Sequence, residues 1–204
     1  TAAPRHFNKP MAEAAYSNIE KVGLPVWTED DQKFAKAVQK VAKGKEEGLA
    51  TKLKPLGKPL EKPESGGSDD IGDISWVVPT ITLRYPSNIP NLPGHNWVNA
   101  MAMATPIAHK GVVAGSKVIG MTTLDLLMDP KLVDASKVYF KDVQNKDQKY
   151  LPVLAADDKP QIQKNVEVMA QFRDRMKEFY YDPAKYPSYL EQLGVKYPEL
   201  EPAK

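Results

Sequence analysis

The chain contains no cysteine, which excludes disulfide bonds, zinc sites built from thiolates and catalysis by a thiol. Only three histidines are present: His6, His95 and His109. The 28 basic and 26 acidic side chains leave a net charge of +2, too small an excess for a dedicated nucleic-acid-binding protein. No apolar run approaches the roughly 20 residues that span a bilayer, and no signal-peptide pattern is visible. We therefore expect neither nucleic acid nor a membrane span.

The 204 residues, 42% of them apolar, suffice for one ordinary folded domain with its own core. The lack of cysteine does not identify the compartment, so the cytoplasm and the periplasm both remain open. The first residue is Thr1 rather than methionine. Either an initiator methionine or a few residues have been removed, or a longer precursor has been cut before Thr1 and this is its carboxyl-terminal product.

Apolar spacing and capping residues predict several helices and one strand. Asn8, Thr28 and Thr105 are the predicted N-caps, and Asp31 occupies the capping-box position after Thr28. A β-branched and aromatic run predicts the strand, and a proline-rich loop follows it. The predicted helices cover residues 8–22, a segment from 28, and 105–128, 131–140 and 161–180; the strand covers 74–85 and the loop 86–99.

This order of elements is typical of an α/β fold, but a single strand is too few for a complete sheet. We therefore expect only part of an α/β domain, over residues 1–145. Within it, lysine, proline and glycine predict a flexible surface segment over residues 43–66. Residues 146–204 form the predicted carboxyl-terminal extension, which is helical and then rich in proline and tyrosine. We find no internal repeat.

His95 is the histidine best placed for chemistry, because it lies in a loop between a predicted strand and a long helix. His109 lies in the first turn of that helix, where it could face a substrate anion or simply act as a cap. Asp69 and Asp70 could accept hydrogen bonds from histidine or substrate, or cap turns. The pair Glu46–Glu47 is better interpreted as a solvated charge cluster than as a base and a ligand.

No sequence motif supplies a complete catalytic centre. The chain lacks the HExxH, GxSxG and phosphate-loop patterns. A dinuclear metal site needs about five or six nitrogen and oxygen ligands around ions about 3.5–4 Å apart. This chain does not obviously provide so many, so we expect it to furnish part of a site.

Three blocks, Gly67–Thr80, Pro93–Trp97 and Ile107–Gly111, resemble the carboxyl-terminal half of M20-type metallo-amidohydrolases, in the aminobenzoyl-glutamate hydrolase branch. Shorter blocks at Asn8–Glu13 and Lys21–Ala35 agree with it, so the resemblance covers roughly residues 8–140. It implies the carboxyl-terminal portion of a zinc-peptidase-like α/β catalytic domain. That domain would be completed by an amino-terminal polypeptide or segment.

The resemblance also implies an activity and a cofactor. Such enzymes hydrolyse amide bonds of N-acyl or N-aroyl amino acids and dipeptides with two divalent metal ions, zinc or manganese. His95 matches the last metal-binding histidine of the family. Asp69, Asp70, His109 and Lys110 are the residues expected to bind substrate or support the metal ligands. The general-base glutamate belongs to the family's amino-terminal half, so no catalytic residue is expected here.

We accordingly expect a partner: the amino-terminal half of the same precursor or a companion subunit, in an assembly that forms a higher homo-oligomer. The substrate would be a small amide. Two alternatives remain open at this point. One is a non-catalytic binding or scaffold subunit that keeps the fold. The other is an amidase that uses Thr1 as an N-terminal nucleophile.

Overall fold

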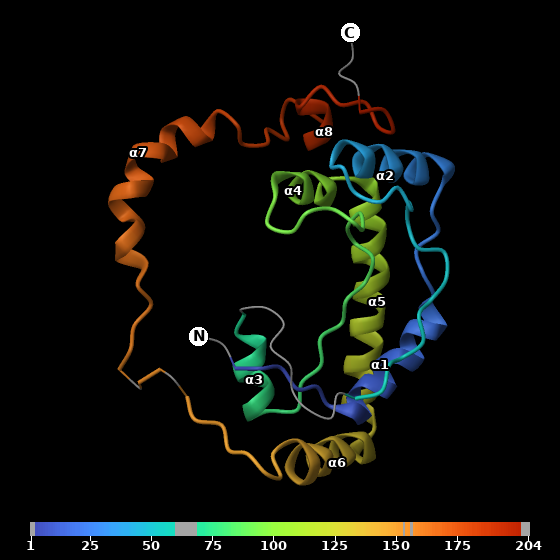
Figure 1. Ribbon diagram of the computed structural model, residues 1–204, viewed down its shortest axis with the longest axis vertical. Coiled ribbons are helices and arrows are strands. Elements are labelled where there is room, and N and C mark those ends of the chain that lie inside the picture. The colour runs from blue at the N-terminus through green and yellow to red at the C-terminus, as the bar shows by residue number, and fades with distance from the viewer. Residues whose placement is uncertain (1–2, 60–68, 153, 156, 201–204) are drawn as a thin grey trace. The chain divides into compact units, whose positions relative to one another are not determined.

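The computed structural model describes residues 3–59, 69–152, 154–155 and 157–200. These residues form helices joined by long loops and contain no β-strand element (Figure 1). The chain divides into two compact units, residues 1–152 and 153–204. The division lies a few residues beyond the predicted boundary after residue 145.

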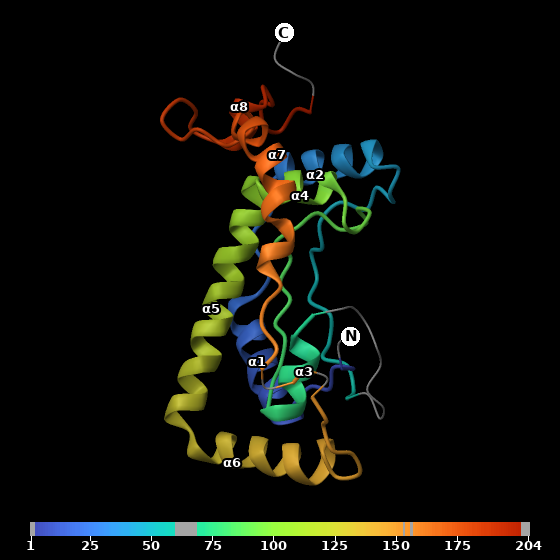
Figure 2. The ribbon, with the colours of Figure 1, turned by 90° about the vertical axis from the view of Figure 1, so that its left-hand side faces the viewer.

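The first unit is organised around α5 (Pro106–Met128), its longest helix. Helices α1 (Lys9–Val22), α4 (Trp97–Met103) and α6 (Pro130–Tyr139) all pack against α5 (Figures 1 and 2). Two further helices, α2 (Glu29–Val41) and α3 (Ile71–Val77), belong to the same unit. A π-helical turn, Phe140–Gln144, continues α6.

The predicted N-caps are confirmed. Asn8, Thr28 and Thr105 each accept a backbone N–H of the first turn of α1, α2 and α5 with a side-chain oxygen. The capping box of α2 is complete, because Asp31 accepts the Thr28 N–H at 2.7 Å and Thr28 Oγ1 accepts the Asp31 N–H at 3.2 Å. These local hydrogen bonds satisfy backbone donors that have no partner within the helix.

The first part of the predicted strand is wrong, because residues 71–77 form α3. Gly72, Ser75 and Trp76 are buried, a spacing of three and four residues that belongs to a helix face rather than a strand. Ser75 Oγ donates to the Gly72 carbonyl at 2.6 Å, inside the helix. Residues 78–85 are non-helical but form no strand, and α4 begins inside the predicted loop.

Two glycines of α5 allow this non-helical segment to cross the helix at close range. A Cβ added at Gly111 would lie 2.2 Å from the Pro86 carbonyl oxygen, and one at Gly115 would lie 3.1 Å from Tyr85 Cβ. Any side chain at Gly111 would therefore push the backbone of residues 86 and 87 away. The close neighbour of these two glycines is thus an irregular segment of the same chain.

Polar side chains join α5 to α1 in the interior. The buried Asn18 amide donates to Thr122 Oγ1 at 3.2 Å and to Asp125 Oδ2 at 2.6 Å. By length and composition α5 could nevertheless cross a membrane, since its most apolar 18-residue window has a mean hydropathy of 1.3. The sequence predicts no such segment, because no apolar run approaches the roughly 20 residues that span a bilayer. Core helices of water-soluble proteins meet the same criterion.

Residues 43–59 contain no helix, as predicted for the surface segment, but two side-chain amides of α2 anchor part of it. Gln39 Oε1 accepts the Gly48 N–H and Gln32 Oε1 accepts the Leu49 N–H, both at 2.8 Å. Gly48 and Leu49 are buried as a result. Residues 60–66 lie outside the described part of the chain.

The second unit contains a 3₁₀ turn (Ile162–Asn165), α7 (Val166–Lys177) and α8 (Tyr189–Gln192). The predicted helix over 161–180 is therefore shorter at both ends. Gln192 holds the tyrosine-rich loop, because its side-chain amide donates to the Tyr180 carbonyl at 2.9 Å and accepts the Asp182 N–H at 2.8 Å.

An ion pair connects α5 to α2. Lys110, one of the expected site residues, binds the carboxylate of Asp31, whose side chain is 1% exposed. The same carboxylate closes the capping box of α2. Lys110 thus neutralises a charge that the fold has removed from water, and such a pair is costly to break from one side.

We predict that Lys110→Met lowers the free energy of unfolding by about 1–3 kcal/mol, because it leaves the Asp31 carboxylate without its cation. Lys117→Met is the matched control, an exposed lysine on the same helix, and should change stability by less than about 0.5 kcal/mol. Urea denaturation followed by circular dichroism measures both. Equal effects of the two substitutions would contradict the stabilising role of Lys110.

Candidate functional site

His95 lies in the loop before α4, and its neighbours hold that loop in place. Asn96 caps α4 by accepting the Val98 N–H at 3.0 Å. Asn99, in the first turn of α4, donates to the Pro93 carbonyl at 2.6 Å and accepts from the Asn88 amide at 2.9 Å. The His95 imidazole itself is exposed. A supported loop therefore presents an accessible imidazole.

The backbone of His95 is strained. Its φ is +52°, in the left-handed region that costs non-glycine residues roughly 1–2 kcal/mol. Such conformations persist where the surroundings impose them, and they cluster at functional sites. Trp97, two residues further along the chain, is 70% exposed, so an imidazole and an indole are both accessible to solvent around the start of α4. This is the local feature of the chain that most favours a functional role for His95.

His109 and Lys110 lie in the first turns of α5, which follows α4 directly and packs against it. His109 is exposed, and its backbone N–H donates to the Thr105 carbonyl at 3.3 Å, as in a regular first turn. Lys110 has the structural ion pair with Asp31 described above. The fold thus brings His95 and His109 to the same end of α5, whereas Lys110 turns its ammonium group to α2.

Asp69 and Asp70 lie elsewhere. Asp69 pairs with Arg5 and accepts the Ile71 N–H at 3.1 Å. Asp70 is exposed at the N-cap position of α3 and makes no side-chain capping bond. Both ribbon views show α3 and α4 near opposite ends of α5 (Figures 1 and 2). Asp70 lies at the start of α3 and His95 before α4, so the expectation that Asp70 accepts a hydrogen bond from a histidine gains no support and stays a prediction.

A polar cluster around the amino-terminal segment was not expected from the sequence. His6 stacks on Trp76 with ring centroids 4.0 Å apart, and its Nε2 is buried with no hydrogen-bond partner among the described residues. The Trp76 indole donates to the Pro4 carbonyl at 2.7 Å. Asp73 accepts the Tyr150 hydroxyl at 2.7 Å, which raises the pKa of Tyr150. These contacts attach residues 3–8 to α3, so His6 is a packing residue.

The described residues do not by themselves form a metal site. No group of three or more histidine, aspartate and glutamate side chains gathers closely enough in them to hold an ion. Glu46 and Glu47 are exposed, and Glu47 pairs with Lys45, as their interpretation as a solvated cluster predicts. The His95 imidazole has the chemistry of a nitrogen ligand for a metal ion.

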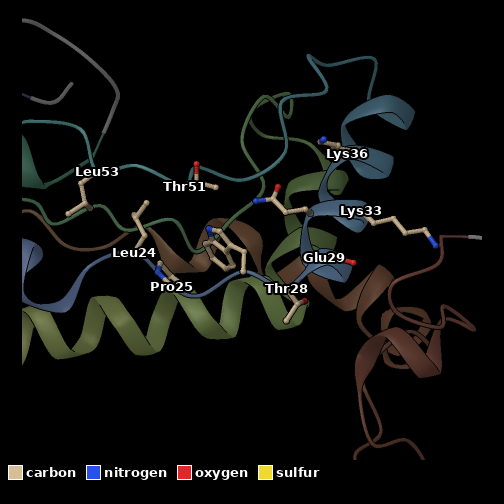
Figure 3. Close-up of a pocket in the computed structure, with 10 residues that line it drawn as sticks. Leu24, Pro25, Thr28, Glu29, Lys33, Lys36, Thr51 and Leu53 are labelled. Atoms are coloured by element: carbon tan, nitrogen blue, oxygen red, sulfur yellow. The ribbon is translucent and has the colours of Figure 1, made fainter.

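A groove of about 770 Å³ lies where the loop before α2 meets the first turns of that helix (Figure 3). The Trp27 indole donates to the Ala50 carbonyl at 2.9 Å, which holds the two bordering loops together. Lys33 and Lys36 give one side positive charge, and Glu29 offsets part of it, so the groove has no strong preference for anions. Its lining is Leu24, Pro25, Trp27, Thr28, Glu29, Gln32, Lys33, Lys36, Thr51 and Leu53.

We predict that His6 makes stability depend on pH. Burial against Trp76 lowers the pKa of His6 below its ordinary value of 6.5, so the folded state favours the neutral ring. Below pH 6.5 the unfolded chain binds a proton that the folded chain resists, and stability falls with acidification. His6→Phe keeps the stacking and should flatten this fall between about pH 7.5 and 5.5 in urea denaturation. Identical pH profiles of the two proteins would contradict the prediction.

Comparison with known proteins finds one informative relative. Over 169 residues the chain is 24% identical to the B component of the p-aminobenzoyl-glutamate hydrolase of Escherichia coli (strain K12). The match covers 72% of this chain and 35% of the relative, so the chain spans about a third of that protein. No family model and no solved structure matches. The chain is therefore a distant homologue of part of a hydrolase subunit.

Proposed function

We propose that this chain is the carboxyl-terminal portion of a metal-dependent amidohydrolase that hydrolyses amide bonds of N-acyl or N-aroyl amino acids or dipeptides. The observation that carries the proposal is the similarity to a p-aminobenzoyl-glutamate hydrolase component over 72% of the chain. The strained, exposed His95 supports it independently, because that loop is built to present an imidazole.

Under this proposal the chain supplies one ligand of a site that another polypeptide completes. His95 donates a ring nitrogen to one of two divalent ions, zinc or manganese. The chemistry such ions supply is polarisation of the scissile carbonyl and a lowered pKa of a bound water. The general-base glutamate and the other ligands belong to the amino-terminal half of the precursor or to a companion subunit. That part also supplies the sheet of the α/β catalytic domain.

Two other expected site residues have defined tasks in this proposal. His109 lies at the same end of α5 as the His95 loop, so its imidazole is available to the substrate. Lys110 stabilises the fold through its ion pair with the Asp31 carboxylate. Asp69 accepts the Ile71 N–H at the start of α3, within the Gly67–Thr80 block of the family resemblance, and Asp70 is exposed at the N-cap position. The nucleophile alternative at Thr1 lies outside the described residues.

The proposal is tested on the enzyme purified natively with its companion polypeptide, with p-aminobenzoyl-glutamate as the amide. Treatment with EDTA should abolish hydrolysis, and Zn²⁺ or Mn²⁺ should restore it. Hydrolysis that survives EDTA and is lost in Thr1→Ala would instead indicate an N-terminal nucleophile. An assembly that contains no metal and hydrolyses no amide would indicate a scaffold subunit.

We predict that His95→Ala lowers the metal content of this assembly and reduces hydrolysis by about 100-fold or more, since even supporting residues of a metal site are worth 10–100-fold. His95→Asn is the matched variant. Asparagine tolerates positive φ, so it keeps the loop backbone while removing the imidazole. Both variants should lose metal and retain the circular dichroism spectrum. Unchanged metal occupancy in both would remove His95 from the proposed site.

A further inference from the structure

One face of α5 is apolar and is not covered by the described residues of the first unit. The buried residues of α5 recur at helical spacing and meet α1, α4 and the segment of residues 85–87 that crosses the helix. On the opposite face, six apolar side chains are 55–79% exposed. They are Val112, Val113, Ile119, Leu124, Leu127 and Met128, which we call the outward face.

The outward face is unsuited to water. Lys117 is the single charged residue between Lys110 and Asp125, so α5 is apolar or small almost all around. A helix of this kind is normally buried on all sides. Only 28% of its most apolar 18-residue window is buried inside this chain. A contiguous apolar surface of this kind marks an interaction site.

Gly120 indicates that the covering element is protein. It lies on the outward face, and a Cβ added there would meet no atom within 4 Å. Nothing in the described chain explains why this helical position lacks a side chain, although glycine destabilises a helix interior relative to alanine. Ser116 and Thr123 are its small neighbours on the same face. A gap of this size allows the close approach of another backbone, whereas acyl chains require no such gap.

The position of His95 indicates which polypeptide covers the outward face. α4 packs against α5, and its Trp97 and Met103 are also exposed apolar side chains. Metal ligands lie about 2 Å from their ion, so the polypeptide that completes the site must reach the His95 loop. The chain spans only 35% of its relative, which leaves a large segment available for this role.

We infer that the outward face of α5 is the surface on which the amino-terminal counterpart of this chain docks. The inference rests on the proposed function. It adds the specific contact surface, which is the apolar outward face along α5. The counterpart would approach the α5 backbone most closely at Gly120, and the shared metal site would lie at the end of α5 that contacts α4.

Because the chain has no cysteine, single cysteines can report coverage. Leu124→Cys and Val113→Cys probe the outward face, and Ser17→Cys, exposed on α1, is the control. Maleimide labelling is measured in the natively purified assembly and divided by the rate in guanidinium. We expect labelling at residues 113 and 124 to be slower than at residue 17 by about tenfold or more, because the face is buried. Equal normalised rates at all three positions would overturn the inference.

The identity of the covering element is read from a photo-crosslinking benzophenone residue placed at position 124 in the same assembly. Adducts to the amino-terminal counterpart support the inference. Adducts to a second copy of this chain, or to lipid, would overturn it. Amide hydrolysis is measured on the same preparation. Adducts to the counterpart in an assembly that hydrolyses nothing would refute the proposed function alone, whereas an active assembly with an unprotected face would refute this inference alone.

Discussion

The first unit depends on the close approach between α5 and the segment that crosses it. Gly111 has no side chain, and the Pro86 carbonyl occupies the space that a Cβ would take. This contact helps to fix the course of the chain between α3 and α4, together with hydrogen bonds such as those from Tyr85 to the Gly23 carbonyl and from Gln39 to the Pro90 carbonyl. The His95 loop begins a few residues after the crossing. Packing at a glycine of α5 therefore contributes to the position of the candidate ligand.

The interior of this unit is unusually polar for its size. Asn8, Asn18, Asp31 and Gln39 are almost fully buried, and each has partners on another segment. Buried polar groups of this kind are stabilising only when satisfied, so they select one arrangement of the elements. The hydrogen bonds of Asn18 to α5 and of Gln39 to the Pro90 carbonyl are examples. A small unit without a sheet thus gains a defined structure.

One side of the unit is ordered by these contacts and the other side is exposed. The inward face of α5 is buried by α1, α4 and the crossing segment, whereas its outward face is exposed among the described residues of the first unit. The candidate site has the same asymmetry. His95 is presented by a supported loop, and no group of three or more potential ligands gathers among the described residues. Both observations agree with a chain that corresponds to a third of its relative.

Local sequence was enough to specify the helices that have strong capping signals. Asn8, Thr28 with Asp31, and Thr105 cap helices where predicted, because capping hydrogen bonds act within one turn. The sequence also indicated His95, through a loop pattern and a family resemblance. Contacts between distant segments determined the features of the fold that local patterns could not predict. α3 replaced the start of a strand because Trp76 and Ser75 are buried on one helix face, and α3 and α4 lie near opposite ends of α5 through long-range packing that no local pattern records.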